Sequence, residues 1–312
     1  MTRFHFDCDP GHDDAVALLV AAKLLDLTGV STVFGNSNIT NTTRNALAIL
    51  EAADLSIPVA KGIGKPLVDN AINAESVHGK SGLDGANLPP PATKPLSISG
   101  PELIINTARQ EDDLKVIAVA PLTNIATAIV DAPDIRDRIR EISIMGGSTT
   151  FGNATPAAEF NIHADPEAAA IVFNSGIPIR MVGLNVTTTF GITVTQVQSL
   201  LATSGKLARA IGGALDFYLN KQQSLYRREY APVHDVCAVA PYTHPALIRH
   251  ENMHVDVECT GKLTRGQTVC DQRRLSAAEG LAPPKASNAA VAVQADGKSI
   301  IDLVMNTLQS YP

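Results

Sequence analysis

The chain has 312 residues, 45% of them hydrophobic, and a mean hydropathy of +0.08, so it can bury a large core. A formal net charge of −6 and a pI near 5.7 argue against a nucleic-acid-binding surface. No apolar stretch is long enough to span a membrane, and Met1 leads almost directly into an aspartate-rich motif with no room for a signal peptide. We therefore expect a cytoplasmic protein that binds neither nucleic acid nor membrane. The four cysteines have no CxxC spacing, which fits a reducing compartment.

Short β-rich runs alternate with helical runs along the first part of the chain. We predict strands at residues 3–6, 30–35, 114–120, 141–147 and 179–184, alternating with helices at 15–25, 42–53, 122–130 and 166–174. Helical spacing continues from 194 to 225, strand-like runs fill 254–294, and a last helix covers 299–308. Segments 68–100 and 148–158 are predicted to be loops. This order predicts an α/β fold with an open, mostly parallel, mixed sheet flanked by helices, Rossmann-like, in one domain spanning residues 1–312.

Four aspartates lie within eight residues where the first predicted strand ends: Asp7, Asp9, Asp13 and Asp14. The run that follows has hardly a polar residue, which is typical of a buried helix. Carboxylates crowded at its start would raise one another's pKa unless a cation compensates, and Ca²⁺ or Mg²⁺ prefers such oxygen ligands. Alternatively, Asp9 only caps the helix, Pro10 is its first residue, and Asp13 and Asp14 are exposed to water.

Polar side chains also follow the other predicted strands. Ligands in open α/β sheets bind at the carboxyl ends of the strands, so these residues are expected to line one pocket. They are Asn36, Thr123, Asn124 and Met145, then Asn153, Glu159, Asn161 and Asp165 in one loop, and finally His234 and Asp235.

The aspartate motif resembles that of a known family. Asp7-Cys8-Asp9-Pro10-Gly11-His12-Asp13-Asp14 is similar to the N-terminal motif of the nucleoside hydrolases, the inosine-uridine-preferring ribohydrolases. The likeness continues in the family's order through Gly35-Asn36, Val77-His78-Gly79-Lys80-Ser81-Gly82-Leu83, Pro121-Leu122-Thr123-Asn124, Met145-Gly146-Gly147, Glu159-Phe160-Asn161, Asp165-Pro166-Glu167-Ala168 and Val233-His234-Asp235. The resemblance implies the nucleoside hydrolase fold and hydrolysis of the N-glycosidic bond of ribonucleosides to free base and ribose, with inversion.

The resemblance also implies roles for individual residues. Ca²⁺ would be held by the side chains of Asp9, Asp14 and Asp235 and by the backbone carbonyl of Thr123. Asp9 would be the general base that takes a proton from the attacking water. Contacts to the ribose are expected from Asp13, Asn36, Met145, Asn153, Glu159 and Asn161. Asp7 is a candidate for orienting the neighbouring aspartates.

Two histidines are candidates for delivering a proton to the leaving base, His234 first and His78 second. The alternatives are that His234 only caps a helix and that His78 is simply exposed in a glycine-rich loop. The other six histidines, His12 among them, are assigned to structure or surface.

The residues that could select the base lie in the run of helical spacing from 194 to 225 and just after it. Gln222 and Tyr226 are four residues apart and share a face, where they could meet a pyrimidine edge; alternatively, both are ordinary surface residues. The chain has no tryptophan, so stacking of a purine on an indole is excluded. We expect uridine and cytidine to be favoured, with inosine possible, and the family resemblance implies a homodimer or homotetramer.

Two other functions fit parts of the sequence. An Asp-x-Asp at a strand end is also found in Mg²⁺-dependent haloacid-dehalogenase-like phosphotransferases, although Pro10 does not match that motif. The second is a non-catalytic nucleoside-binding or ribose-binding protein on the same fold, for which a general base and a proton donor would be unnecessary.

Overall fold

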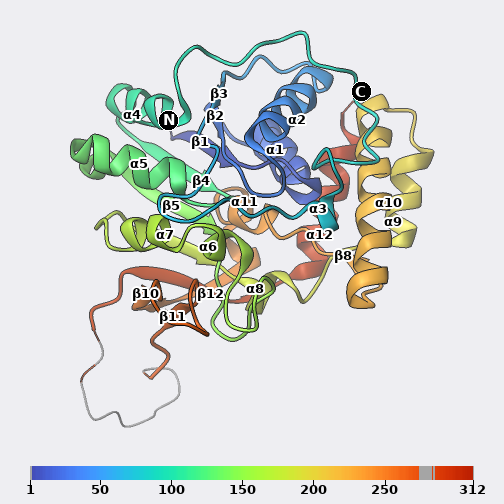
Figure 1. Cartoon of the computed structure of the whole chain (residues 1–312). Coiled ribbons are helices and arrows are strands. Elements are labelled where there is room, and N and C mark those ends of the chain that lie inside the picture. Colours follow the sequence, from blue (N-terminus) through green and yellow to red (C-terminus); the bar gives the residue numbers. More distant parts are fainter. Residues whose placement is uncertain (1, 274–282, 284, 312) are drawn as a thin grey trace.

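The computed structural model describes residues 2–273, 283 and 285–311, and its centre is one eight-stranded sheet (Figure 1). The strand order is β3-β2-β1-β4-β5-β6-β12-β9, and every neighbouring pair is parallel except β12 and β9. The strands are β1 (Arg3–Cys8), β2 (Leu27–Thr32), β3 (Val59–Lys61), β4 (Leu114–Ala118), β5 (Ile139–Met145), β6 (Ile179–Val182), β9 (Ile248–Met253) and β12 (Ala289–Ala295). The predicted mostly parallel, mixed sheet is confirmed. Because β1 and β12 share it, the sheet supports the proposed single domain over residues 1–312.

Helices cover both faces of the sheet (Figure 1). The core on one face includes α1 (His12–Leu24), α2 (Ile39–Ala52), α9 (Val194–Ala202), α10 (Lys206–Tyr226), α11 (Val236–Thr243) and α12 (Gly297–Gln309). The core on the other includes α4 (Gly100–Gln110), α5 (Thr123–Asp131) and α7 (Pro166–Phe173). The short elements are α3 (Glu75–His78), α6 (Phe160–Ala164), α8 (Leu184–Thr187), two 3₁₀ turns (Pro133–Asp137 and Pro245–Leu247), and the strand pairs β7 (Ile192–Thr193) with β8 (Tyr230–Ala231) and β10 (Val255–Val257) with β11 (Thr268–Cys270).

The predicted elements of the first 200 residues are present, with ends shifted by a few residues. The helical spacing predicted over 194–225 is confirmed, and residues 203–205 divide it into the two helices α9 and α10. Several elements were not predicted, among them β3, β9 and α4. The start of α4 has a sequence signal, since Ser99 and Glu102 form a reciprocal capping box and Pro101 occupies the first turn. Of the strand-like run over 254–294, residues 274–282 and 284 lie outside the described residues.

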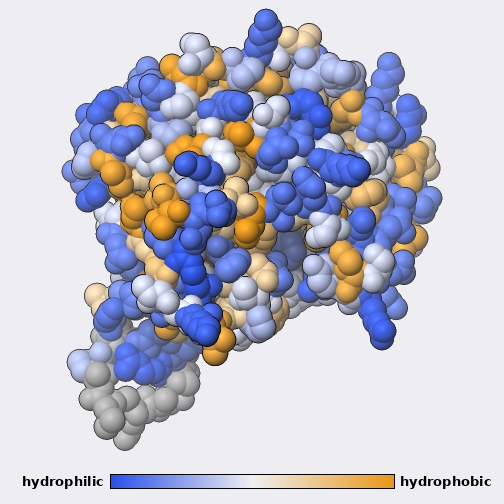
Figure 2. Space-filling view, in the orientation of Figure 1, coloured by the Kyte–Doolittle hydropathy of each residue, from blue (hydrophilic) through white to orange (hydrophobic). Residues whose placement is uncertain are grey.

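The order of the strands locates the place where a ligand can bind. From β1 the chain moves outward through β2 and β3, and it then returns to place β4 on the other side of β1. The carboxyl ends of β1 and β4 are therefore the switch point of the sheet. Residues Asp9 and Thr123 follow these two strands. No helix among the described residues is long and apolar enough to cross a membrane, and Figure 2 shows hydrophilic and hydrophobic residues interspersed over one face.

Candidate active site

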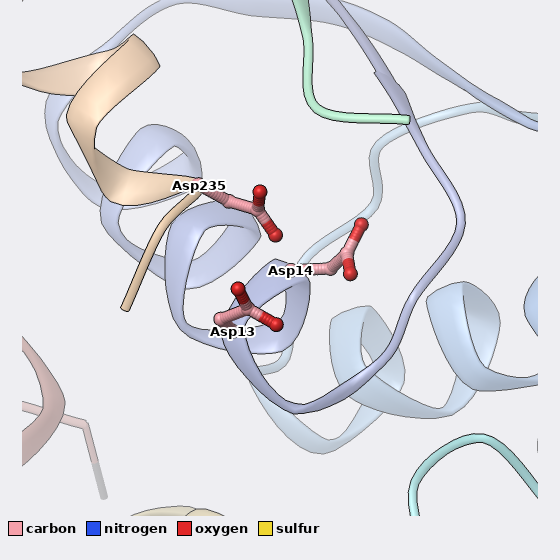
Figure 3. A group of neighbouring side chains, drawn as sticks. All are labelled: Asp13, Asp14 and Asp235. Carbon is pink, nitrogen blue, oxygen red and sulfur yellow. The ribbon is translucent and has the colours of Figure 1, made fainter. Parts of the chain in front are cut away.

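Four buried carboxyl groups meet at the carboxyl end of β1, and we call Asp9, Asp13, Asp14 and Asp235 the carboxylate cluster. Oxygen atoms of Asp13, Asp14 and Asp235 lie within 4.8 Å of one another. Figure 3 shows these three side chains converging from the start of α1 and the start of α11. Asp9 lies beside Asp14, close enough for a hydrogen bond between their side chains. The alternative in which Asp13 and Asp14 are exposed is wrong, since they are 5% and 0% exposed.

Backbone and amide groups fix the orientation of Asp9 and Asp14. Asp14 Oδ1 accepts from the Asp9 N–H at 3.1 Å, and its Oδ2 accepts from the Gly11 N–H at 3.0 Å and from Asn36 Nδ2 at 2.7 Å. Asp9 Oδ2 accepts from the Asn36 N–H at 2.6 Å. Gly35 has a φ of 155° and leaves no space for a side chain, because a Cβ atom there would lie 2.0 Å from Asp9 Oδ2. Asn36 therefore contacts both Asp9 and Asp14.

The carboxylate cluster lacks a compensating charge among the described residues in contact with it. Burial, and next the charge of Asp14, raises the pKa of Asp13 to about 8 and that of Asp9 well above its usual value. Burial likewise raises the pKa of Asp235 well above its usual value. Asp9 Oδ1 is buried and has no hydrogen-bond partner in the part of the chain that the structure describes. An all-oxygen set with an open carboxylate oxygen fits a hard divalent cation such as Ca²⁺.

Thr123 and Asp7 lie beside this cluster and contact other residues. The Thr123 hydroxyl donates to Asp165 Oδ2 at 2.6 Å, and Thr123 begins α5, directly after the turn that follows β4. Asp7 Oδ1 accepts from Asn124 Nδ2 at 2.8 Å and from the Ser31 hydroxyl. Asp7 thus ties β1 to β2 and α5, which fits a supporting role rather than a ligand.

The predicted ribose contacts come from the loop before the short helix α6, where Asn153 is exposed, and from α6 itself. Glu159 caps α6: its Oε1 accepts from the Asn161 N–H, and its Oε2 accepts from the Gly147 and Ile162 N–H groups. Burial raises the pKa of Glu159 to about 7 despite these hydrogen bonds. Asn161 Nδ2 donates to the Val119 and Met145 carbonyls, which leaves its Oδ1 atom to face a ligand.

A second set of residues lines the same cavity, and we call His78, Gln222, Tyr226, Arg228 and His234 the histidine–arginine group. His78 ends α3 and is 6% exposed, so the alternative in which it is simply exposed is wrong. The His234 ring is half-buried, and its Nδ1 lies 2.8 Å from the Thr187 hydroxyl. Burial lowers the pKa of His234 to about 3 and that of His78 well below its usual value.

Arg228 reaches the cavity because of the way α10 ends. Arg227 takes the left-handed conformation, with φ 55°, and the chain turns back so that the Arg228 N–H donates to the Gln222 carbonyl. The Arg228 guanidinium then donates to Gln222 Oε1 at 3.3 Å and lies 5.5 Å from the centre of the Tyr226 ring. Gln222 is buried and Tyr226 is half exposed, so they are not two equivalent surface residues.

Most of the predicted site residues line one cavity. They are His78, Asp13, Asn36, Met145, Asn153, Glu159, Asn161, Gln222, Tyr226, His234 and Asp235. Asp9, Asp14 and Thr123 are not among its lining residues and are fully buried. The cavity also has residues that sequence reasoning missed, chiefly Tyr218 and Arg228. The sequence pattern could have identified Tyr218, since it precedes Gln222 and Tyr226 at the same four-residue spacing. Nothing in the sequence except its charge pointed to Arg228 as a cavity residue.

Comparison with known proteins places the chain in a family. The model of the inosine-uridine preferring nucleoside hydrolase family matches residues 4–302. The chain belongs to this family. A pyrimidine-specific ribonucleoside hydrolase RihA of Escherichia coli O127:H6 is 40% identical over 310 residues, covering 98% of this chain and 97% of that protein. RihA of Shewanella sp. strain ANA-3 is 39% identical over 315 residues, covering 98% and 95%.

Solved structures of nucleoside hydrolases have the same fold. The purine-preferring ribonucleoside hydrolase from Gardnerella vaginalis superposes with a TM-score of 0.91 at 28% identity, and the plant nucleoside hydrolase PpNRh1 with 0.92 at 29%. Both alignments cover 99% of each chain. The predicted family, fold and enzyme class are thereby confirmed. The fold alone carries no information on base preference, because the purine-preferring protein shares it.

Proposed function

We propose that this chain hydrolyses the N-glycosidic bond of ribonucleosides, with uridine and cytidine favoured and inosine possible, to free base and ribose with inversion. One observation carries the proposal: Asp13 and Asp235 of the carboxylate cluster line the same cavity as the buried His78 and the half-buried His234. Membership of the nucleoside hydrolase family supports it. The same membership disfavours the phosphotransferase alternative.

We assign the carboxylate cluster to the sugar and the attacking water. Ca²⁺ bound by Asp9, Asp14, Asp235 and the Thr123 carbonyl would hold the ribose hydroxyls, lower the pKa of the water and keep these carboxyl groups ionised. Asp9 would take the proton from the attacking water, because its Oδ1 atom has no other partner among the described residues. Asp13 and Asn161 accept hydrogen bonds from the ribose hydroxyls, and Asn153 and Glu159 hold the 5′-hydroxyl.

The transition state of this reaction has positive charge on the ribose. Carboxylate and amide oxygens fixed around the ring stabilise a charge that develops only as the bond breaks. Attack by water on the face opposite the base gives inversion in one displacement. The departing base needs a proton or hydrogen bonds, and His234 is the first candidate for this role and His78 the second.

The preference for pyrimidines is supported by the relatives and by the cavity. The RihA proteins are named as pyrimidine-specific. Gln222 offers an amide and Arg228 a guanidinium, and both suit the carbonyl and amide edge of uracil or cytosine. No tryptophan is available to stack on a purine.

We also propose that the protein is cytoplasmic and forms a homodimer or homotetramer, as the family resemblance implies. Size-exclusion chromatography with light scattering would test the assembly, and a mass of one chain would contradict it.

The decisive experiment is a substrate panel. Uridine, cytidine and inosine are each incubated with the Ca²⁺-loaded protein, and free ribose is measured as reducing sugar; Asp14→Asn, which keeps the shape of the side chain, is the control. We expect ribose from uridine and cytidine fastest and at least a 100-fold loss in the variant, within the usual range of about 10²–10⁴ for such catalytic groups. Binding of uridine without ribose release would indicate a nucleoside-binding protein instead. Release of phosphate from a phosphomonoester would indicate a phosphotransferase.

A further inference from the structure

His12 lies one residue before the aspartates of α1 and has contacts that the proposed mechanism does not use. The residue is fully buried, so it belongs to neither the surface nor the lining of the cavity. Its ring Nδ1 lies 3.0 Å from Nδ1 of His78, and its backbone nitrogen lies 3.3 Å from the same His78 atom. Both contacts therefore act on a single nitrogen of His78.

The other side of the His12 ring is held by the loop after α3. His12 Nε2 lies 3.0 Å from the carbonyl oxygen of Asp84, which can only accept a hydrogen bond. Asp84 is itself fixed, because its carboxylate accepts from the Lys80 and Ser81 N–H groups. His12 Nε2 is thus the donor, so Nδ1 of the neutral His12 ring is an acceptor and His78 Nδ1 donates the hydrogen bond between the two rings. The His12 ring cannot turn without losing its bond to Asp84.

Aromatic rings pack around the pair of histidines. The His12 ring stacks on Tyr218 at 5.3 Å and on Phe217 at 5.5 Å, with interplanar angles of 3° and 13°. The His78 ring stacks on Tyr218 as well, at 5.5 Å and 19°. This packing holds both rings nearly parallel.

The packing of His78 also depends on Gly11. A Cβ atom at Gly11 would lie 2.6 Å from His78 Nδ1, so only glycine lets the His78 ring approach the backbone at this point. With Nδ1 held against Gly11 and His12, the Nε2 atom on the far side of the ring is the nitrogen left for the cavity that His78 lines. Without the His12 ring, His78 Nδ1 loses its side-chain hydrogen-bond partner, and only the stacking on Tyr218 and the packing against Gly11 remain to orient the ring.

We propose that His12 is a positioning residue for departure of the base: it fixes the His78 ring through Nδ1, so that Nε2 of His78 faces the leaving base. This inference rests on the proposed hydrolysis of nucleosides. Under the competing explanation His12 only fills space at the start of α1, and its replacement would disturb the neighbouring Asp13 and Asp14. The two explanations differ in which step of the reaction depends on His12.

Two substrates with the same sugar separate these explanations. Uridine needs help for its base to leave, whereas p-nitrophenyl riboside releases p-nitrophenolate, which departs without protonation. We expect His12→Leu to lower kcat for uridine about 100-fold, the loss that follows from a catalytic group misplaced by about 1 Å. Its kcat for p-nitrophenyl riboside should stay within twofold of the wild type.

Conservative variants show which bond matters. The amide of His12→Asn occupies the place of Nδ1 and can still reach His78, so we expect it to keep most of the activity on uridine. The amide of His12→Gln occupies the place of Nε2 and keeps only the bond to the Asp84 carbonyl, so we expect the loss to persist. In a His78→Ala background, His12→Leu should cause no further loss, because His12 acts through His78.

His5 supplies a matched control, since it is a fully buried histidine that does not line the cavity. We expect His5→Leu to affect both substrates equally. The inference would be overturned if His12→Leu lost the same activity on both substrates, whether or not the variant was misfolded. An unchanged rate on uridine would also overturn it. A wild-type protein that cleaves neither substrate would instead overturn the proposed function, and the inference with it.

Discussion

The carboxylate cluster and the histidine–arginine group meet at one cavity, which Asp13 and Asp235 of the cluster line. Apart from the chain neighbours His234 and Asp235, the two groups come from different parts of the fold. Asp9, Asp13 and Asp14 follow β1, the strand at the switch point of the sheet, and Asp235 precedes α11, which packs on α1. All four are at most 5% exposed. The histidine–arginine group lies at the ends of α3 and α10 and in a loop, and its Tyr226 is 49% exposed.

This difference indicates which residues act on the sugar and water and which residues select the base. Residues fixed by the sheet and a buried helix suit the sugar and water, which are the same in every ribonucleoside. Residues at helix ends and loops can change without disturbing the core, which suits recognition of a base that differs between substrates. Variants in the two sets should therefore differ in whether the leaving group matters.

Removal of Ca²⁺ is expected to have the largest effect. A chelator should lower the rate on uridine and on p-nitrophenyl riboside alike, by about 10³-fold or more, because the carboxylate cluster acts on the sugar and water common to both. Assays in buffer treated with EGTA, then restored with Ca²⁺, measure this loss. A loss confined to uridine would contradict the assignment of the carboxylate cluster to the sugar and water, since it would mean that the cation acts on the departing base.

Replacement of Arg228 should have a smaller and selective effect. Arg228→Ala removes a charged donor from the cavity, and a lost hydrogen bond of this kind corresponds to an increase of about 10-fold or more in KM for uridine. The rate on p-nitrophenyl riboside should be unchanged.

Arg227→Asn is the matched control for Arg228→Ala. Arg227 is exposed and in the left-handed conformation, which asparagine tolerates, so the variant loses a charge one residue away and keeps the turn. A similar rise in KM in both variants would mean that overall charge, and not contact with the base, is responsible.

The smallest effect is expected at His5, which is buried in the sheet outside both groups. Burial lowers the pKa of His5 from 6.5 to about 3. The unfolded chain therefore binds a proton that the folded chain does not bind between these values, and stability falls as the pH drops from 6.5 towards 3. His5→Gln removes the titrating ring and keeps a polar group near Ser31. The slope of its free energy of unfolding against pH should therefore be smaller than that of the wild type by up to about 1.4 kcal/mol per pH unit. Urea denaturation at pH 6.5, 5.5 and 4.5 tests this, and identical slopes would contradict it.

Sequence patterns predicted the carboxylate cluster better than the histidine–arginine group, for a physical reason. Asp9, Asp13 and Asp14 are neighbours in sequence, and a strand followed by a buried helix places them together in one turn. Arg228 reaches Gln222 only because Arg227 adopts a left-handed conformation. The sequence does not predict this conformation, because position 227 is not a glycine. The contact between His12 and His78 joins residues 66 positions apart, and its formation depends on how the loop after α3 packs. The sheet order likewise required long-range pairing that local patterns do not encode.

The central claim is that Asp9 removes a proton from the water that cleaves a pyrimidine ribonucleoside. Uracil release from uridine by the Ca²⁺-loaded protein, compared with Asp9→Asn under identical conditions, tests it most directly. We predict steady release of uracil by the wild type, with one ribose for each uracil, and a rate at least about 10²-fold lower in the variant. Equal rates in the two proteins would contradict the account.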